Sequence, residues 1–130
     1  MQIKLNKIPI APLAPTALLV LLLTGCDPAP ITSVVSGDAE RGRIAIQSAG
    51  CGSCHSIAGI TSADGRVGPP LKGIDQRVYL AGVLPNTFAN MVNWLQNPAQ
   101  VDPMTAMPDT GLDTQTAGDI AAYLYSGGAQ

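Results

Sequence analysis

The sequence predicts a small all-α protein in which helices and long loops wrap around a bound group. Three segments carry apolar residues at helical spacing, and no segment shows a convincing strand pattern. Stretches rich in Gly and Pro separate these segments. Loops of this length are uncommon in a small domain unless they enclose something. The chain has only five aromatic residues, so a bound group is expected to fill part of a thin core.

The first predicted helix begins after Ser36 or Asp38, since either side chain can cap it, and runs to about Ala49. Gly50 ends it. Gly42 lies in the middle of this helix, where glycine is costly unless something packs closely against the backbone. We therefore expect a close contact at Gly42.

The second predicted helix covers Thr87–Gln96, with Asn86 as its N-cap and Pro98 as its stop. Its apolar stripe consists of Phe88, Met91, Val92 and Leu95. A loop over Thr61–Gly73 precedes this helix, and a second loop over Gln100–Gly111 follows it.

The last predicted helix begins at Asp113 or Thr114 and runs to about Tyr125. Two consecutive glycines, Gly127 and Gly128, end it. The class predicted from these elements is all-α with long loops.

The run Cys51-Gly52-Ser53-Cys54-His55 directly follows the first predicted helix. C-x-x-C-H is the attachment signature of c-type haem, in which two thiols add across the porphyrin vinyl groups and the next imidazole binds iron. The spacing lets one helical turn present both sulfurs to one porphyrin edge. The pattern therefore predicts one covalent haem c bound by Cys51 and Cys54, with His55 as an iron ligand.

The second axial ligand has several candidates. His55 is the only histidine, so the chain cannot supply two imidazoles, and Met, Lys, water or an open position remain. Met104 and Met107 lie in the second loop, whereas Met91 lies on a helix, where methionine is a common core filler. Pro108 stiffens the chain beside Met107. Met107 is therefore preferred, with Met104 as the alternative.

The N-terminal segment has the features of an export signal. Lys4 and Lys7 form a charged region, and Ala17–Leu23 is apolar. Leu23-Thr24-Gly25-Cys26 then resembles a bacterial lipobox, in which the cysteine becomes the first mature residue and carries lipid. Prolines disfavour a membrane-spanning helix, and an ordinary cleaved signal would need an A-x-A site that the segment lacks. We expect lipidation at Cys26.

Three regions are thus expected: a lipoprotein signal peptide over 1–25, a lipid-anchored tether over 26–36, and a monohaem domain over 37–130. The expected location is the periplasmic side of a bacterial cell membrane, where haem attachment takes place. Asp27 follows the lipidated cysteine. That arrangement resembles a signal for retention in the inner membrane, so the inner membrane is preferred to the outer.

Removal of the signal peptide would make the protein acidic. Two of the seven basic residues lie before Cys26, which leaves five basic and nine acidic residues and a side-chain balance of −4. This charge argues against nucleic acid or anionic lipid as a binding target. It is compatible with a partner that presents basic groups around its docking site.

Three further motifs stand in a fixed order: Gly68-Pro69-Pro70-Leu71-x-Gly73-x-x-x-Arg77, Trp94-Leu95-Gln96-Asn97-Pro98 and Asp119-Ile120-Ala121-Ala122-Tyr123-Leu124. Together with C-x-x-C-H, they resemble the class I c-type cytochromes, the family of mitochondrial cytochrome c and many bacterial relatives. The resemblance covers about Gly37 to Ser126. It implies the small cytochrome c fold, with helices and loops around one covalently attached haem.

The resemblance also implies roles for individual residues. Pro69 would offer its carbonyl to the second nitrogen of the iron-bound imidazole, which fixes the plane of that ring. Met107 matches the axial methionine, and Trp94 matches an aromatic residue beside it. Arg77 matches an arginine near a haem propionate.

In the same family, the first and last helices cross at a Gly–Tyr pair, which corresponds to Gly42 and Tyr123. Gly42 would then let the Tyr123 ring lie against the helix backbone. The segment Tyr79–Pro85 follows no motif of the family.

The expected function is transfer of single electrons between redox partners of a respiratory or photosynthetic chain, without catalysis on small molecules. The expected partners are membrane complexes such as a terminal oxidase, a bc1-type complex or a dehydrogenase, and the carrier itself is expected to be monomeric. The alternative is a dedicated haem subunit of a periplasmic dehydrogenase or oxidase complex. A haem sensor with an open sixth position and a thioredoxin-like oxidoreductase that uses Cys51 and Cys54 fit the motifs less well.

Overall fold

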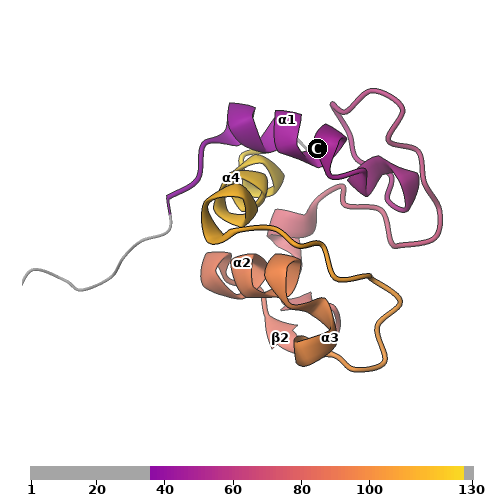
Figure 1. The fold of residues 1–130 in the computed structure, drawn as a ribbon, viewed down its shortest axis with the longest axis vertical. Helices are drawn as coiled ribbons and strands as arrows, with labels where there is room; N and C mark the ends of the chain where they lie inside the picture. The colour runs from indigo at the N-terminus through magenta and orange to yellow at the C-terminus, as the bar shows by residue number, and fades with distance from the viewer. Residues whose placement is uncertain (1–35, 128–130) are drawn as a thin grey trace, which may run out of the picture. The chain divides into compact units, whose positions relative to one another are not determined.

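The computed structural model describes residues 36–127, which belong to one compact unit, Ser33–Gln130 (Figure 1). Helices dominate these residues, so the predicted all-α class is confirmed. The predicted signal peptide, the lipidation site Cys26 and all but the last residue of the predicted tether lie outside the described residues. The elements in chain order are α1 (Ala39–Ser48), η1 (Cys51–Ser53), η2 (Ile74–Gln76), β1 (Tyr79–Leu80), β2 (Leu84–Pro85), α2 (Phe88–Gln96), α3 (Pro98–Val101) and α4 (Thr114–Tyr125).

Helix α1 is capped by Asp38, whose side chain accepts a hydrogen bond from the backbone N–H of Arg41 at 2.8 Å. This bond satisfies one of the backbone N–H groups that a helix N-terminus leaves without a partner. Asp38, and not Ser36, is thus the cap. Gly50, with φ 70°, follows the helix and turns the chain into η1.

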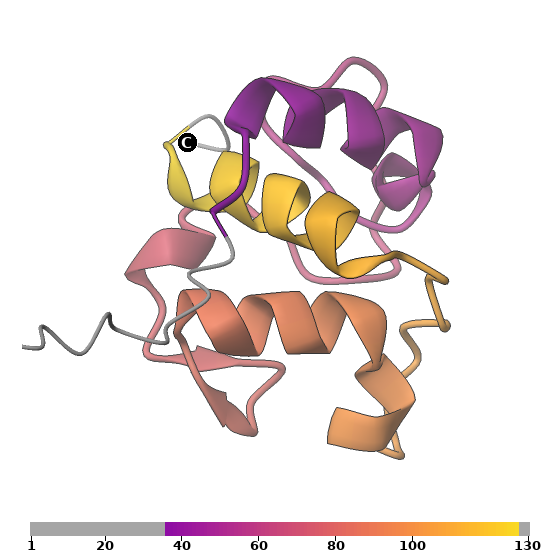
Figure 2. The ribbon, with the colours of Figure 1, turned by 60° about the vertical axis from the view of Figure 1, so that its left-hand side comes forward.

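Helices α1 and α4 cross in direct backbone contact at Gly42 (Figures 1 and 2). A Cβ atom added at Gly42 would lie 1.9 Å from the carbonyl oxygen of Asp119, so only glycine allows this crossing. The expectation of a close contact is confirmed. The nearest atoms are backbone atoms of Asp119 and Ile120 and not the Tyr123 ring, and the Tyr123 hydroxyl donates to the carbonyl of Ala58 at 2.9 Å.

A buried carboxylate ties the start of α1 to α4. Asp119 is 4% exposed. It accepts hydrogen bonds from Arg41 Nε at 2.8 Å and from the backbone N–H of Asp38 at 2.7 Å, while Gln115 on its own helix adds a third donor at 3.0 Å. The Arg41 guanidinium is the largest cause that holds the pKa of Asp119 at about 2, well below its ordinary value.

Helix α2 begins one residue later than predicted, and the prediction that Asn86 is its N-cap was wrong. The Thr87 hydroxyl accepts from the backbone N–H of Asn90 at 3.2 Å and is the N-cap. Asn86 is not available for capping because its side-chain amide donates to the carbonyls of Ile74 and Arg77 at 2.7 and 2.6 Å.

Helix α2 ends at Gln96, as predicted from the proline that follows at position 98. Asn97 leaves helical geometry with φ −133°, and Pro98 is the first residue of α3. Proline suits the first position of a helix because its missing N–H would have no partner there.

A short antiparallel hairpin joins η2 to α2 and was not predicted. Its register pairs Tyr79 with Pro85 and Leu80 with Leu84. Two residues are too few to show the alternation of a strand. Ala81 and Gly82 form the turn with φ 51° and 76°. The hairpin thus fills the segment that matched no family motif.

The core lies between α1, α2 and α4, and its largest buried side chains include Ile46, Leu80 and Ile120. Within residues 36–127, no helix is long and apolar enough to cross a bilayer.

Candidate functional site

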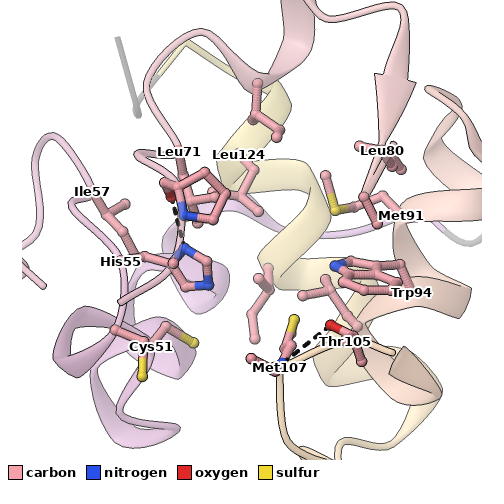
Figure 3. Close-up of a pocket in the computed structure, with 18 of the residues that line it drawn as sticks. Cys51, His55, Ile57, Leu71, Leu80, Met91, Trp94, Thr105, Met107 and Leu124 are labelled. Carbon is pink, nitrogen blue, oxygen red and sulfur yellow. Dashed lines mark hydrogen bonds between the residues drawn. The ribbon is translucent and has the colours of Figure 1, made fainter. Parts of the chain in front are cut away.

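A cavity of about 430 Å³ lies inside this unit (Figure 3). Loops and helices from the whole length of the domain surround it, so its shape depends on the complete fold. Most of its lining is apolar. The apolar residues come from α1, η2, β1, α2 and α4 and from the loops between them: Ile46, Ile57, Leu71, Ile74, Leu80, Met91, Leu95, Ile120 and Leu124.

The two thiols of the C-x-x-C-H motif line one end of the cavity. Cys51 and Cys54 are half-buried and free, and the His55 backbone N–H bonds to the Cys51 carbonyl at 3.0 Å, which closes one turn. Burial raises the pKa of the Cys51 thiol. The turn presents both sulfurs and the imidazole to the same space, as the spacing predicted.

The His55 ring is held from two sides. Its Nδ1 lies 2.8 Å from the Pro69 carbonyl oxygen, which is the contact that the family resemblance implied. A Cβ at Gly68 would lie 2.3 Å from Cε1 of the ring, so the backbone of Gly68 packs flat against the imidazole. With Nδ1 engaged by a carbonyl, Nε2 is left to coordinate a metal.

Met107 faces His55 across the cavity. Its sulfur points inward from the opposite side (Figure 3). The Met107 backbone N–H donates to the Thr105 hydroxyl at 3.1 Å, a local bond that fixes the loop at this point. Met104 is 90% exposed and does not line the cavity, whereas Met91 lines it from α2. Of the two loop methionines, only Met107 is in position to act as a ligand.

Trp94 and Arg77 complete the predicted set. Trp94 projects from α2 and lines the cavity on the Met107 side (Figure 3). Arg77 lines it as well, and its Nη2 donates to the Pro70 carbonyl. Among the described lining residues, Arg77 is the only lysine or arginine. The structure therefore brings all seven predicted cofactor-binding residues to one cavity.

Sequence reasoning assigned no individual role to two residues that shape the site. Gly68 was part of a recognised motif, but its packing against His55 depends on the chain folding back. The Thr105 bond could have been found, because a threonine two residues before a loop residue commonly accepts from its backbone N–H.

The donor set and the cavity shape fit a haem. Two thiols at one end match two vinyl groups, the apolar walls match a flat hydrocarbon ring, and an imidazole and a thioether on opposite sides match the axial positions of iron. The fold and site thus define a helical protein that encloses one covalently attached porphyrin.

The chain belongs to the cytochrome c family, whose family model matches residues 39–127. The protein accordingly carries one covalent haem c and serves haem-based electron transfer. The fold is also found in cytochrome c2 from Rhodobacter sphaeroides, with a TM-score of 0.53 and 21% identity, over 70% of this chain and 96% of that one.

A sequence relative is cytochrome c oxidase subunit 2 of Alkalihalophilus pseudofirmus, which is 31% identical over 91 residues. The match covers 68% of this chain and 25% of the relative, so this chain spans about a quarter of that protein.

Proposed function

We propose that this protein is a membrane-tethered electron carrier whose haem is bound through Cys51 and Cys54 and whose iron is held between His55 and Met107. The observation that carries this proposal is the arrangement across the cavity. An imidazole oriented by a carbonyl faces a thioether, and the two thiols lie at one end.

The haem, when bound, supplies one-electron exchange between iron(II) and iron(III). The chain supplies position and electrostatics. Pro69 and Gly68 fix the His55 ring, and Thr105 fixes the loop that presents Met107. A ligand set held in advance needs little rearrangement when the charge changes, which favours fast electron transfer.

Three features of the chain favour the reduced state and thus a high potential. The thioether of Met107 is a weak donor. The apolar lining disfavours the extra positive charge of the oxidised centre. The Arg77 side chain can offset the negative charge of a haem carboxylate, because a planar guanidinium can donate two hydrogen bonds to a carboxylate.

If His55 and Met107 both held the iron, no open position on it would remain for a substrate. The protein therefore acts as a carrier and not as an enzyme. Contacts with redox partners would be small and transient.

The tether is proposed from the sequence alone. A lipid on Cys26 would hold the monomeric domain at the periplasmic side of the cell membrane, close to membrane complexes. Terminal oxidases, bc1-type complexes and dehydrogenases are the candidate partners. The similarity to a region of cytochrome c oxidase subunit 2 supports a respiratory partner.

The same similarity supports a second candidate, a dedicated haem subunit of an oxidase or dehydrogenase complex. The two candidates differ in the lifetime of the complex. A carrier is released from membrane partners by high salt, whereas a subunit remains with its complex when that complex is purified at high salt.

Haem attachment is tested by the mass of the matured protein together with its reduced pyridine spectrum. One haem added to the lipidated chain is expected, and a mass without any porphyrin would contradict the proposal. The tether is tested with Cys26→Ser. This variant is expected to lose the mass of the lipid while it keeps its haem spectrum, because the thiol that would carry the lipid is gone.

A further inference from the structure

The haem carboxylates are expected at the end of the cavity that lies away from the cysteines. This inference rests on the proposed attachment through Cys51 and Cys54. In a porphyrin of this type, the vinyl and propionate groups stand on opposite edges. Figure 3 shows Cys51 and Leu80 at opposite ends of the cavity. The chain that forms the wall with Leu80, from Ile74 to Gly82, also contains Arg77, the only lysine or arginine among the described lining residues, whose Nη2 donates to the Pro70 carbonyl.

That wall is built from very short elements. It consists of η2, with three residues, and of the hairpin β1–β2, with two residues in each strand. Hairpins of this size are marginal unless other parts of the chain hold them. The position of Arg77, between η2 and β1, therefore depends on bonds from outside these elements.

Asn86 supplies those bonds. Its side-chain amide donates to the carbonyls of Ile74 and Arg77, at 2.7 and 2.6 Å, and its backbone N–H donates to the Val78 carbonyl at 2.9 Å. Asn86 thus binds the first residue of η2, Arg77 directly after η2, and Val78. These bonds add to the turn's own, which join the N–H of Gln76 to the carbonyl of Gly73 at 3.1 Å and the N–H of Arg77 to the carbonyl of Ile74 at 3.2 Å.

Tyr125 holds Asn86 in turn. The Tyr125 hydroxyl, near the end of α4, donates to Asn86 Oδ1, so the amide oxygen is engaged and the amide nitrogen must face η2. The Tyr125 ring also packs near Phe88 of α2, with ring centroids 6.1 Å apart. The wall is in this way connected to α2 and α4.

We propose that Asn86 and Tyr125 are positioning residues for the haem carboxylates. They act through Arg77, because they hold the backbone from which its guanidinium reaches the cavity. A fixed cation at this place disfavours the extra positive charge of the oxidised iron. Loss of the Asn86–Tyr125 bond would let the wall loosen, so that Arg77 is held less firmly and water screens its charge. The expected consequence is a lower reduction potential with the iron ligands unchanged.

Tyr125→Phe tests this pair in the matured, haem-loaded protein, because it removes the hydroxyl and keeps the ring. We expect the ratio of reduced to oxidised protein, at a fixed electrode potential, to fall about threefold. At 59 mV per tenfold for one electron, this is a decrease of about 28 mV. Asn86→Ala and Arg77→Gln are expected to lower the potential in the same direction.

The matched control is Tyr123→Phe, which removes a tyrosine hydroxyl from the same helix. That hydroxyl bonds to the Ala58 carbonyl, and Tyr123 does not line the cavity. We expect a loss of stability without a change in potential. Arg77→Gln should lower the reduction potential less in the Asn86→Ala background than in the parent protein, since both changes act on the same contact.

The proposal is overturned if Tyr125→Phe keeps the parent potential, or if Arg77→Gln does. It is also overturned if Tyr123→Phe lowers the potential as much as Tyr125→Phe. The pyridine spectrum of each variant separates these outcomes from a failure of the proposed function, because haem attachment is then measured independently. If Asn86→Ala does not fold, Tyr125→Phe still decides the question.

Discussion

The imidazole of His55 shows how much of the site depends on a residue that has no side chain. Three ring atoms of His55 lie within 3.0 Å of the place where a Cβ of Gly68 would be. Real Cβ atoms do not come this close to a ring. The Pro69 carbonyl and the Gly68 backbone together leave one orientation for the ring, and that orientation directs it into the cavity.

Gly68→Ala is therefore expected to displace the His55 ring. Overpacking of this kind costs about 1–3 kcal/mol in the free energy of unfolding. The measurements are denaturant unfolding and the visible spectrum of the oxidised protein. The control is Val78→Ala, where the side chain is largely exposed and does not line the cavity, and the expected change is within about 0.5 kcal/mol. Equal stability and spectra for both variants would contradict this account of the ring.

Several features of single residues could be predicted from the sequence. Asp38, one of the two predicted caps, caps α1, and α4 begins at Thr114, one of its two predicted starts. C-x-x-C-H brings its thiols and imidazole together. Other features could not, because their partners lie far along the chain. Arg41 and Asp119 are 78 positions apart, and only the folded chain brings Asn86 to η2 instead of to the N-terminus of α2.

At the scale of elements, the α1–α4 crossing is the most specific contact of the fold. It combines a glycine contact at Gly42 with the bonds of Asp119 to Arg41 and to the backbone of Asp38. A buried carboxylate with donors on all sides stabilises the fold only while it is ionised.

Acid is expected to weaken this crossing. The folded pKa of Asp119 is about 2, below its ordinary value of 3.8. Its contribution to stability is thus complete above about pH 4 and is lost as the pH falls toward about 2. Asp119→Asn should be less stable at neutral pH and should lose less stability over this interval, as measured by thermal unfolding at a series of pH values.

Glu40→Gln is the matched control for that experiment. Glu40 and Arg43 form an exposed pair on α1, and exposed pairs contribute little to stability. The pH dependence of thermal unfolding of Glu40→Gln should follow that of the parent protein closely. An Asp119→Asn profile with the parent's full acid dependence would show that another group is responsible.

At the scale of the whole molecule, the cofactor completes the core. Without the haem, the apolar lining of the 430 Å³ cavity has no packing partner, and a domain of this size has little other apolar surface to bury. Small domains have about 5–15 kcal/mol of total stability, so the haem decides whether the chain folds.

Cys51→Ala with Cys54→Ala, purified without haem, is therefore expected to lack a cooperative thermal transition in far-ultraviolet circular dichroism. The haem-loaded parent should show one. A cooperative transition near the parent's melting temperature in the haem-free double variant would mean that the helices make a sufficient core by themselves.

The central claim is that His55 and Met107 hold the iron from opposite sides of the cavity. The most direct measurement is the weak absorption band at the red end of the oxidised spectrum, which reports a methionine–iron bond. The account predicts that Met107→Ala loses this band while Met104→Ala keeps it, because Met104 is exposed and lies away from the cavity. A band that survives Met107→Ala, or disappears in Met104→Ala, would contradict the account.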